Sequence, residues 1–289
     1  MKQVKPKKSL GQHFLTDLTI ARRIADTVDA CPDIPVLEIG PGMGVLTQFL
    51  ITKPREVAAV EIDRESIAYL RQHFPQFAAP LPTGEGLGVG LSLISGDFLR
   101  MDLHDLFDGR QFVLTGNYPY DISSQIFFKM LDNRDLIPCC TGMIQREVAL
   151  RMAAQPGSKT YGILSVLIQA WYNVEYLFTV EPSVFNPPPK VQSAVIRMTR
   201  NDVASLGCDE HLFRRIVKTV FNQRRKMLRV SLRQLLSADA INALQHSLDT
   251  PLPEQEETGE RLSLTLRPEQ LSIPQFVDLT NHVAPLLNP

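Results

Sequence analysis

The sequence predicts an α/β protein in which a doubly wound, mostly parallel sheet of seven strands is followed by a small all-helical domain. Short apolar segments alternate with helical segments up to about residue 155, and this alternation is typical of consecutive βαβ units. After residue 200 the helical pattern continues without a strand signal. We therefore expect two domains, one formed by residues 1–200 and the other by residues 201–289.

The expected strands are short and mostly apolar. They span residues 36–39, 57–63, 91–97, 111–116, 141–145, 174–180 and 193–198. Helices are expected over residues 16–30, 45–51, 146–154 and 161–172, with another from residue 122. No helix separates the last two strands, so we expect them to pair antiparallel. The Pro- and Gly-rich stretch 79–90 should form an irregular surface loop.

The composition limits the class of protein. The 289 residues are 44% hydrophobic and 21% charged, with a formal net charge of -1, as in a soluble globular protein. The amino terminus lacks the apolar core of a secretory signal, and no apolar run is long enough to span a membrane. We therefore expect a cytoplasmic protein that does not bind a membrane.

Cysteines and histidines give no sign of a metal centre. The six histidines have no metal-ligand spacing, so we expect no structural zinc and no other metal. The cysteines form no C-x-x-C pair, and we expect reduced thiols at Cys31, Cys139, Cys140 and Cys208.

Polar groups follow the strands at the points where the strands end. A turn containing Gly40, Gly42 and Gly44 follows the first strand and lets a ligand approach the backbone closely. Glu61 lies at the end of the second strand, and Asp97 ends the third. The carboxyl ends of parallel strands share one edge of a sheet, so these groups should line one ligand crevice. The alternative for each acid is a helix N-cap or a solvated loop position.

Asn117-Tyr118-Pro119-Tyr120 is the most informative stretch of the chain, because it can hold a planar base that carries an exocyclic amine. The Asn117 side-chain oxygen and a nearby carbonyl can accept both amine hydrogens, while Tyr120 stacks on the base. Acceptors on both hydrogens favour the pyramidal, nucleophilic form of the amine, which is a transition-state effect. On its own, the tetrapeptide would be interpreted as an ordinary turn.

Taken together, the motifs resemble those of the ribosomal RNA adenine dimethyltransferases, and most closely the bacterial small-subunit enzymes of that family. The resemblance extends from residue 5 to about residue 280. The matching segments are Ser9–Leu15, Glu38–Gly42, Glu61–Asp63, Gly96–Asp97, Asn117–Tyr120, Val184–Val191 and Phe221–Lys226.

The resemblance implies a Rossmann-like class I methyltransferase fold with S-adenosyl-L-methionine as the methyl donor. It implies N6,N6-dimethylation of two adjacent adenosines in a hairpin loop near the 3′ end of small-subunit (16S) ribosomal RNA. Because the family acts during subunit assembly, the expected partner is an immature 30S subunit. We further expect the protein to be a monomer.

Each motif residue then has an expected role. Asn117 should contact both the methyl donor and the amine, and Tyr120 should stack on the target adenine. Phe185, held by a rigid proline run, is the candidate for the opposite face of that adenine, with core packing as the alternative. These three are the expected catalytic residues. The expected cofactor-binding residues are His13, Leu15, Gly40, Gly42, Glu61, Asp97 and Asn117, of which the first two rest on the resemblance alone. Gly44 is expected to complete the floor of the cofactor site with Gly40 and Gly42.

The segment 214–233 contains eight basic residues and no Asp or Glu. On one continuous helix, all of the basic residues except Arg224 would lie within about a third of the circumference, opposite an apolar face. A solvated amphipathic face is the usual alternative, but such a face normally mixes both signs of charge. We therefore expect an RNA-binding stripe. Its main residues are Lys218, Arg225, Lys226 and Arg229, helped by Lys2, Lys5, Lys7 and Lys8 of the amino terminus.

The sequence departs from the family pattern at two points. Tyr118 stands where the family tetrapeptide usually has Leu, and we expect this change to be tolerated because the flanking residues touch the base. The loop 79–90 is longer than the family pattern suggests, and it precedes Asp97.

Three other functions are compatible with part of these motifs or with the fold. A large-subunit adenine methyltransferase of the antibiotic-resistance type shares these motifs, but Phe221–Lys226 and the extended amino terminus fit the small-subunit enzymes better. A non-catalytic assembly or transcription factor on the same fold should have lost part of the cofactor site, which is intact here. A DNA adenine methyltransferase often carries Asp-Pro-Pro-Tyr, and Asn117 disfavours it.

Overall fold

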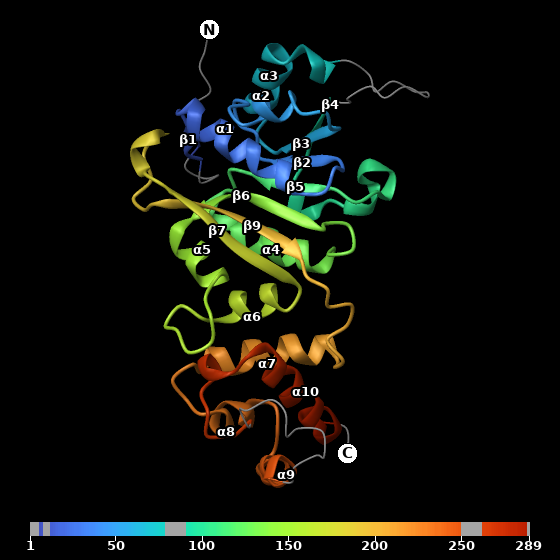
Figure 1. The fold of residues 1–289 in the computed structure, drawn as a ribbon, viewed down its shortest axis with the longest axis vertical. Coiled ribbons are helices and arrows are strands. Elements are labelled where there is room, and N and C mark those ends of the chain that lie inside the picture. Colours follow the sequence, from blue (N-terminus) through green and yellow to red (C-terminus); the bar gives the residue numbers. More distant parts are fainter. Residues whose placement is uncertain (1–5, 8–11, 79–90, 250–261, 288–289) are drawn as a thin grey trace. The chain divides into compact units, whose positions relative to one another are not determined.

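The computed structural model describes residues 6–7, 12–78, 91–249 and 262–287 (Figure 1). The predicted loop 79–90 lies outside the described residues. Two compact units make up the chain. The first comprises Met1–Ala149 and Tyr172–Arg200, and the second comprises Leu150–Trp171 and Asn201–Pro289. One boundary between units therefore follows Arg200, and the second unit also takes in an earlier segment.

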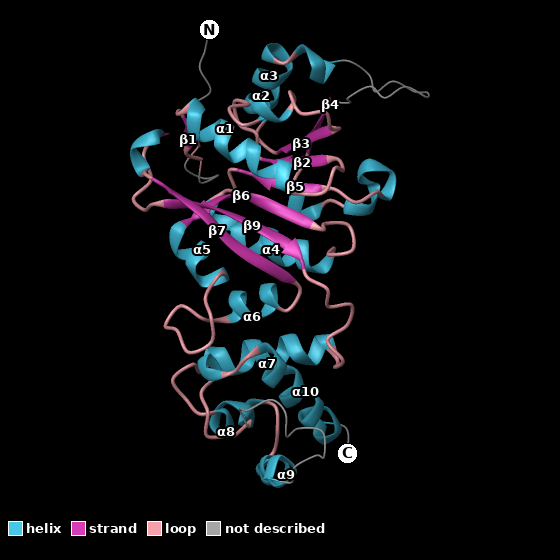
Figure 2. Ribbon diagram, viewed as in Figure 1, coloured by secondary structure: helices cyan, strands magenta, loops and turns pink. Residues whose placement is uncertain are grey.

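A seven-stranded sheet forms the centre of the first unit, in the order β4-β3-β2-β5-β6-β9-β7. β9 pairs antiparallel with β6 and with β7, and the other neighbouring strands are parallel, so the mostly parallel sheet is confirmed (Figure 2). The predicted antiparallel pairing of the last two long strands is also confirmed. The strands are β2 Val36–Ile39, β3 Val57–Glu61, β4 Leu91–Ser95, β5 Val113–Gly116, β6 Cys139–Gln145, β7 Tyr172–Val180 and β9 Ser193–Arg200.

The helices around this sheet are shorter than the sequence pattern predicts. α1 begins where the Asp17 side chain accepts from the N–H groups of Thr19 and Ile20, and the 3-10 helix η2 Thr27–Ala30 follows it. The residues after the glycine turn form further turns, so the helix expected over 45–51 is reduced to α2. The helices are α1 Leu18–Asp26, α2 Thr47–Leu50, α3 Arg64–His73, α4 Ser123–Asp132 and α5 Arg146–Met152. The remaining 3-10 helices are η3 Pro75–Ala78, η4 Phe98–Arg100, η5 Leu103–Gly109, η6 Tyr120–Ile122 and η7 Pro182–Val184.

A large part of the core forms where α1 packs on the sheet. Ala21, Ile24 and Ala25 of α1 and Val28 of η2 are fully buried at 0% exposure. They lie in one apolar cluster with side chains of β2, β3, β5, β6 and β9. These four residues recur at helical spacing, as expected for a helix that buries one face.

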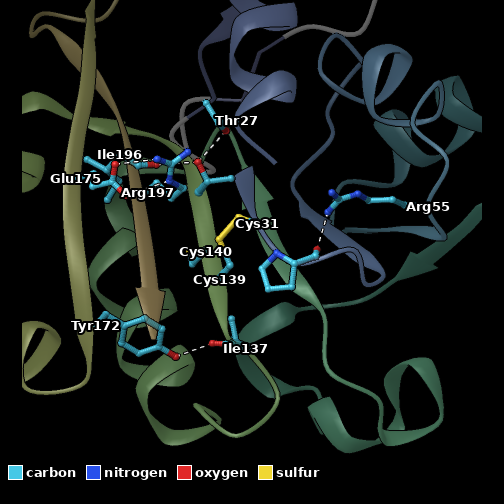
Figure 3. Close-up of a disulfide and its surroundings, with 12 residues drawn as sticks. Thr27, Cys31, Arg55, Ile137, Cys139, Cys140, Tyr172, Glu175, Ile196 and Arg197 are labelled. Carbon is cyan, nitrogen blue, oxygen red and sulfur yellow. Dashed lines mark hydrogen bonds and ion pairs between the residues drawn. A yellow bond between two sulfur atoms is a disulfide. The ribbon is translucent and has the colours of Figure 1, made fainter. Parts of the chain in front are cut away.

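Cys31 and Cys139 form a disulfide in this core, so the prediction of reduced thiols is wrong for these two cysteines (Figure 3). Cys31 follows η2 and Cys139 begins β6, and they are 108 residues apart in the sequence. Packing of η2 against β6 brings them together, which no local cysteine motif could indicate. Cys140 and Cys208 carry free thiols.

Helices make up the second unit, and its described residues, 150–171, 201–249 and 262–287, contain no strand. α7 packs against α6 and α10, with the ring of Phe221 beside those of Tyr161 and Phe276. In the part of the chain that the structure describes, no helix is long and apolar enough to cross a membrane. The elements are α6 Ile163–Gln169, α7 Glu210–Asn222, α8 Leu228–Ser231, η8 Leu232–Gln234, α9 Ala238–Asp249, η10 Pro268–Gln270 and α10 Ile273–Leu287.

Candidate active site

A pocket of about 270 Å³ opens at the carboxyl ends of β2, β3, β4 and β5. β2 lies between β3 and β5 in the sheet, so the pocket is at the point where the strand order reverses, the usual ligand position in open α/β sheets. Every residue predicted for catalysis or cofactor binding lines it except Gly44 and Phe185. Those residues are His13, Leu15, Gly40, Gly42, Glu61, Asp97, Asn117 and Tyr120.

The glycine turn and Glu61 hold each other in position. Gly42 has a φ of 57°, a conformation that favours glycine, and its N–H donates to Glu61 Oε2 at 3.0 Å. The N–H groups of Ile62 and Asp63 donate to Oε1 at 2.9 and 2.8 Å. Burial raises the pKa of Glu61, and these backbone hydrogen bonds oppose that effect. Oε2 retains acceptor capacity for a ligand hydroxyl, because a carboxylate oxygen accepts two hydrogen bonds.

Gly44 lies outside the pocket, unlike the other two glycines of the turn. Its φ is 75°, and a Cβ built there would lie 2.4 Å from the Phe74 ring. Glycine at this position therefore permits close packing against the end of α3.

Two acids act as helix N-caps, as the alternative interpretation of the sequence suggested. Asp97 Oδ1 accepts from the N–H of Leu99 at 3.0 Å and caps η4, but Asp97 also lines the pocket. Asp97 Oδ2 lies 3.5 Å from Nε of the exposed Arg100. Asp63 accepts from the N–H of Glu65 at 3.3 Å and is not a lining residue. Of these two acids, only Asp97 is placed to meet a ligand in the pocket.

Glu38 lines the pocket although the sequence patterns assign it no role. It is 1% exposed, and its Oε2 accepts a hydrogen bond from Thr47 Oγ1 at 2.7 Å. Burial raises the pKa of Glu38 to about 8; the Thr47 hydrogen bond opposes this shift, and the charge of Glu61 adds to it. Glu38 therefore holds its proton at neutral pH and ties β2 to α2. An acid inside an otherwise apolar strand is the sequence signal that points to it.

Asn117 lies immediately after β5, and its backbone bridges to Met143 of β6. Its side-chain Nδ2 donates to the main-chain carbonyl of His13 at 3.3 Å. The amide nitrogen is thus engaged, and Oδ1 is the atom left to accept from a ligand. Pro119 follows with a φ of -57° and no N–H, so its backbone offers only an acceptor.

Tyr118 turns into the core between these pocket residues. Its ring is 1% exposed, and its hydroxyl donates to the Thr141 carbonyl at 3.0 Å and lies 3.1 Å from Cys140 Sγ. Gly142 makes room for the ring, since a Cβ there would lie 2.7 Å from Tyr118 Cε2. The departure from the family pattern is therefore accommodated by a glycine on the neighbouring strand.

Tyr120 has contacts at its ring, hydroxyl and backbone. Its ring stacks on His13 with centroids 5.7 Å apart and an interplanar angle of 29°. Its hydroxyl shares a hydrogen bond with Ser193 Oγ, and its carbonyl accepts from Ser123 Oγ at 3.1 Å. Burial raises the pKa of Tyr120, which the Ser193 hydrogen bond partly opposes.

The amino-terminal segment crosses the pocket and is fastened to a distant part of the chain. β1 Phe14–Leu15 pairs antiparallel with β8 Phe185–Asn186. The Thr16 N–H donates to the Val184 carbonyl at 2.8 Å, and His13 Nδ1 lies 2.8 Å from the Pro187 carbonyl oxygen. These contacts place His13 and Leu15 at the pocket.

Phe185 does not reach the pocket. It is 4% exposed and belongs to the apolar cluster that contains Leu15, its partner in the β1–β8 pair. This arrangement contradicts the predicted stacking of Phe185 on the target base and agrees with the core-packing alternative. The reason is a pairing with β1 that local sequence does not reveal.

Lys7 is engaged in ion pairs rather than being part of an open basic surface. Its Nζ pairs with Asp63 and lies 3.1 Å from Glu65 Oε1. Hydrogen bonds with these two carboxylates raise the pKa of Lys7. Lys2, Lys5 and Lys8 lie outside the described residues.

The continuous helix predicted over residues 214–233 is wrong, because α7 ends at Asn222 and α8 begins at Leu228. The N–H groups of Leu228 and Arg229 donate to the carbonyls of Leu266 and Leu264 at 2.9 and 3.1 Å. These long-range hydrogen bonds replace the bonds to the preceding turn that a continuous helix requires.

The predicted RNA-binding residues are consequently distributed over three local structures. Lys218 is on α7 and Arg229 on α8, while Arg225 and Lys226 lie in the turn between these helices. All four are exposed. Arg224 differs from them, because its guanidinium donates to the main-chain carbonyls of residues 158 and 159.

The described residues offer no metal site. Within the described residues, no group of three or more His, Cys, Asp or Glu side chains could hold a metal ion.

Ile62 and Leu99 line the pocket beside Glu61 and Asp97, and Ile62 is 54% exposed. Sequence reasoning missed both residues, and an apolar residue directly after Glu61 is the signal that indicates Ile62.

Comparison with known proteins decides the family. A family model described as Ribosomal RNA adenine dimethylase matches residues 3–262. The chain belongs to the ribosomal RNA adenine dimethylase family. The resemblance inferred from the motifs is thereby confirmed.

Relatives of this dimethylase family member match it over nearly its whole length. Ribosomal RNA small subunit methyltransferase A of Bacteroides thetaiotaomicron is 62% identical over 98% of this chain and 96% of its own. The protein of the same name from Porphyromonas gingivalis strain W83 is 55% identical, covering 97% of this chain and 98% of its own.

Solved structures of similar proteins share the fold. A dimethyladenosine transferase from Plasmodium falciparum superposes with a TM-score of 0.71 at 24% identity, covering 94% of this chain and 98% of its own. The 23S rRNA methyltransferase ErmE superposes with a TM-score of 0.61 at 25% identity, covering 93% of this chain and 99% of its own. This member of the dimethylase family therefore has the fold of known methyltransferases.

Proposed function

We propose that this protein dimethylates N6 of two adjacent adenosines in the 3′-terminal hairpin loop of small-subunit ribosomal RNA, with S-adenosyl-L-methionine as methyl donor. One observation carries the proposal: Glu61, Asp97 and Asn117 line the same pocket as Tyr120. Residues suited to a nucleoside cofactor and residues suited to a target base thus face one cavity.

The residues that line the pocket suit the donor in chemistry. The pocket volume of about 270 Å³ lies just below the roughly 300–1,000 Å³ usual for small-molecule sites. Glu61 Oε2 would accept from the ribose hydroxyls, and Asp97 would accept from the adenine amine. Gly40 and Gly42 have φ values of 64° and 57° and would let the cofactor lie against the backbone. When bound, the donor supplies a methyl group made electrophilic by its sulfonium.

Asn117 would act on the target amine. Its Oδ1 is free to accept one amine hydrogen because Nδ2 is bonded to the His13 carbonyl. A backbone carbonyl near Pro119 would accept the other, and Tyr120 would support the base from one side. Two acceptors stabilise the pyramidal amine that attacks, so the residues align and activate the nucleophile without a general base. The methylated nitrogen then releases its proton to water.

The second unit would contribute RNA binding. Arg225, Lys226, Arg229 and Lys218 are exposed on α7, on α8 and in the turn between them. Basic side chains of this kind contact phosphates, which provide most of the sequence-independent affinity for RNA. We propose an immature 30S subunit as the partner, a monomeric enzyme, and a division of roles in which the first unit transfers the methyl group and the second unit binds RNA.

The alternatives have weaker support. The large-subunit enzyme ErmE is 25% identical to this chain, whereas the small-subunit enzyme of Bacteroides thetaiotaomicron is 62% identical. A non-catalytic factor would not need Glu61, Asp97, Asn117 and Tyr120 to line one pocket.

A methylation assay tests the proposal. The protein is incubated with labelled donor and small subunits that lack the two dimethyladenosines, beside large-subunit RNA and duplex DNA. Transfer of up to four methyl groups per small subunit to two neighbouring adenosines is the expected result, since each N6 accepts two. Transfer to large-subunit RNA alone would favour the antibiotic-resistance type. No transfer by the wild-type protein to any substrate would favour the non-catalytic function.

A further inference from the structure

We propose that Ser193 is a positioning residue that fixes the ring of Tyr120 for stacking on the target adenine. This inference rests on the proposed function, in which Tyr120 supports that base, and extends it to a residue outside the pocket. Ser193 begins β9, which is far from the tetrapeptide in the sequence.

The link between the two residues is a hydrogen bond between their hydroxyl groups. Tyr120 lines the pocket, whereas Ser193 is at 0% exposure and does not. The hydroxyl of the pocket residue Tyr120 is thus held by Ser193, a residue that does not line the pocket. A tyrosine ring turns about two side-chain bonds, and fixing its hydroxyl removes much of that freedom before the base arrives.

Ser193 makes a rigid anchor because strands flank it on both sides. Its register partners are Gln145 of β6 and Val180 of β7. The Arg146 N–H also donates to the carbonyl of the preceding Gln192 at 2.9 Å. Backbone held in the interior of a sheet opens less readily than backbone in a loop. The Cα–Cβ bond of Ser193 therefore has a fixed position relative to the sheet, and only one side-chain torsion remains to place its hydroxyl.

The other contacts of Tyr120 determine which side of the ring is available. His13 stacks on one face with the ring centroids 5.7 Å apart, too close for a base to insert between them. Ser123 Oγ holds the Tyr120 carbonyl at 3.1 Å. The adenine therefore stacks on the face opposite His13, and the Ser193 hydrogen bond sets the tilt of that face.

A loss of this hydrogen bond leaves the ring in place but less well oriented. Alignment of the amine with the methyl group should suffer, while the donor site built on Glu61 and Asp97 is untouched. We expect the maximal rate to fall about 3- to 10-fold, the effect of one neutral hydrogen bond, and the donor KM to stay unchanged.

The experiment measures single-turnover methyl transfer to unmethylated small subunits by Ser193→Ala, Tyr120→Phe and the double variant. Each single variant should slow transfer about 3- to 10-fold, and the double variant should be no slower than either, because all three lack the same bond. Ser165→Ala is the matched control. Ser165 is equally buried, and its hydroxyl accepts from the Gly162 N–H at 2.9 Å in the second unit. This control should retain the wild-type rate.

A wild-type rate for folded Ser193→Ala, or single effects that multiply in the double variant, would overturn the proposal. If Ser193→Ala does not fold, Tyr120→Phe decides, because it removes the same bond while keeping the ring. Tyr120→Ala distinguishes the proposed stacking role of Tyr120 from the proposed positioning role of Ser193. A Tyr120→Ala variant with full activity would reject the stacking role itself. Loss of activity in Tyr120→Ala with no effect of Ser193→Ala or Tyr120→Phe would reject only the positioning role.

Discussion

The side-chain amide of Asn117 donates from Nδ2 to the main-chain carbonyl of His13, with the two atoms 3.3 Å apart. His13 belongs to the amino-terminal segment, which β8 holds across the pocket. This hydrogen bond orients the amide, so that Oδ1 is the atom left to accept from the target amine in the proposed function. The amino-terminal segment therefore contributes to the orientation of Asn117, the residue proposed to be catalytic, as well as to the wall of the pocket.

Asn117→Ala should reduce methyl transfer about 10²- to 10³-fold while leaving the fold intact, because it removes an acceptor that acts on the transition state. Single-turnover transfer and circular dichroism measure the two effects. Asn133→Ala is a suitable control, since the Asn133 amide also donates to a carbonyl, at 2.8 Å, but lies outside the pocket. A folded Asn117→Ala variant with a near wild-type rate would show that this side chain is not catalytic.

Glu61→Ala should weaken binding of S-adenosylhomocysteine about 10- to 100-fold, the range expected for lost hydrogen bonds to a charged group. The melting temperature should also fall, because three backbone N–H groups lose their acceptor. Calorimetric titration and thermal melting give both values. Glu56→Ala, at the opposite end of β3, controls for loss of a carboxylate. Unchanged affinity would make Glu61 a purely structural acid.

Glu38→Gln should alter the pH dependence of stability. The pKa of Glu38 is raised from 4.5 to about 8 in the folded protein, so the native state binds a proton that the unfolded state has released. This contribution to stability is complete below pH 4.5 and is lost as the pH rises through about 8. The difference in melting temperature, variant minus wild type, should therefore increase from pH 5 to pH 8. An equal difference at both pH values would contradict the raised pKa, and Glu147→Gln provides an exposed carboxylate as control.

Arg225→Glu combined with Arg229→Glu should weaken binding to small subunits and flatten its salt dependence. Each lost phosphate contact should reduce the log–log slope by about 0.7–0.9. Donor affinity should not change. Binding is measured over a salt series beside Arg64→Glu with Arg71→Glu, an exposed pair on α3. If both double variants behave alike, the segment between α7 and α8 has no special part in RNA binding.

Reduction of the Cys31–Cys139 disulfide should lower stability by about 2–5 kcal/mol, because the bond closes a long loop in the unfolded chain. Thermal melts with and without dithiothreitol measure this, and Cys31→Ser should show no shift on reduction. Thiol titration of the unfolded protein should find two free thiols before reduction, Cys140 and Cys208. Four thiols in the absence of reductant would show that the bond is not formed.

Much of the fold and of the pocket follows from the sequence alone. Strand and helix patterns in alternation require a sheet with crossover helices, and parallel strands present their carboxyl ends at one edge. A polar residue at the end of an apolar strand therefore lies at that edge, and the local sequence pattern is enough to predict this position. Glu61, Asp97 and Asn117 could be assigned to one pocket for this reason.

Contacts between residues of distant segments could not be predicted, because they depend on packing in three dimensions. Phe185 is buried because β8 pairs with β1, and Tyr120 is anchored because Ser193 begins a strand at the centre of the sheet region formed by β6, β9 and β7. The predicted basic helix breaks because Leu228 and Arg229 find backbone acceptors at residues 264 and 266. Periodicity describes one segment at a time, whereas these contacts depend on chain separations of tens to more than a hundred residues. The fold class and the polar residues at the strand ends are therefore predictable from local patterns, whereas packing between remote segments determines which side chains reach the pocket.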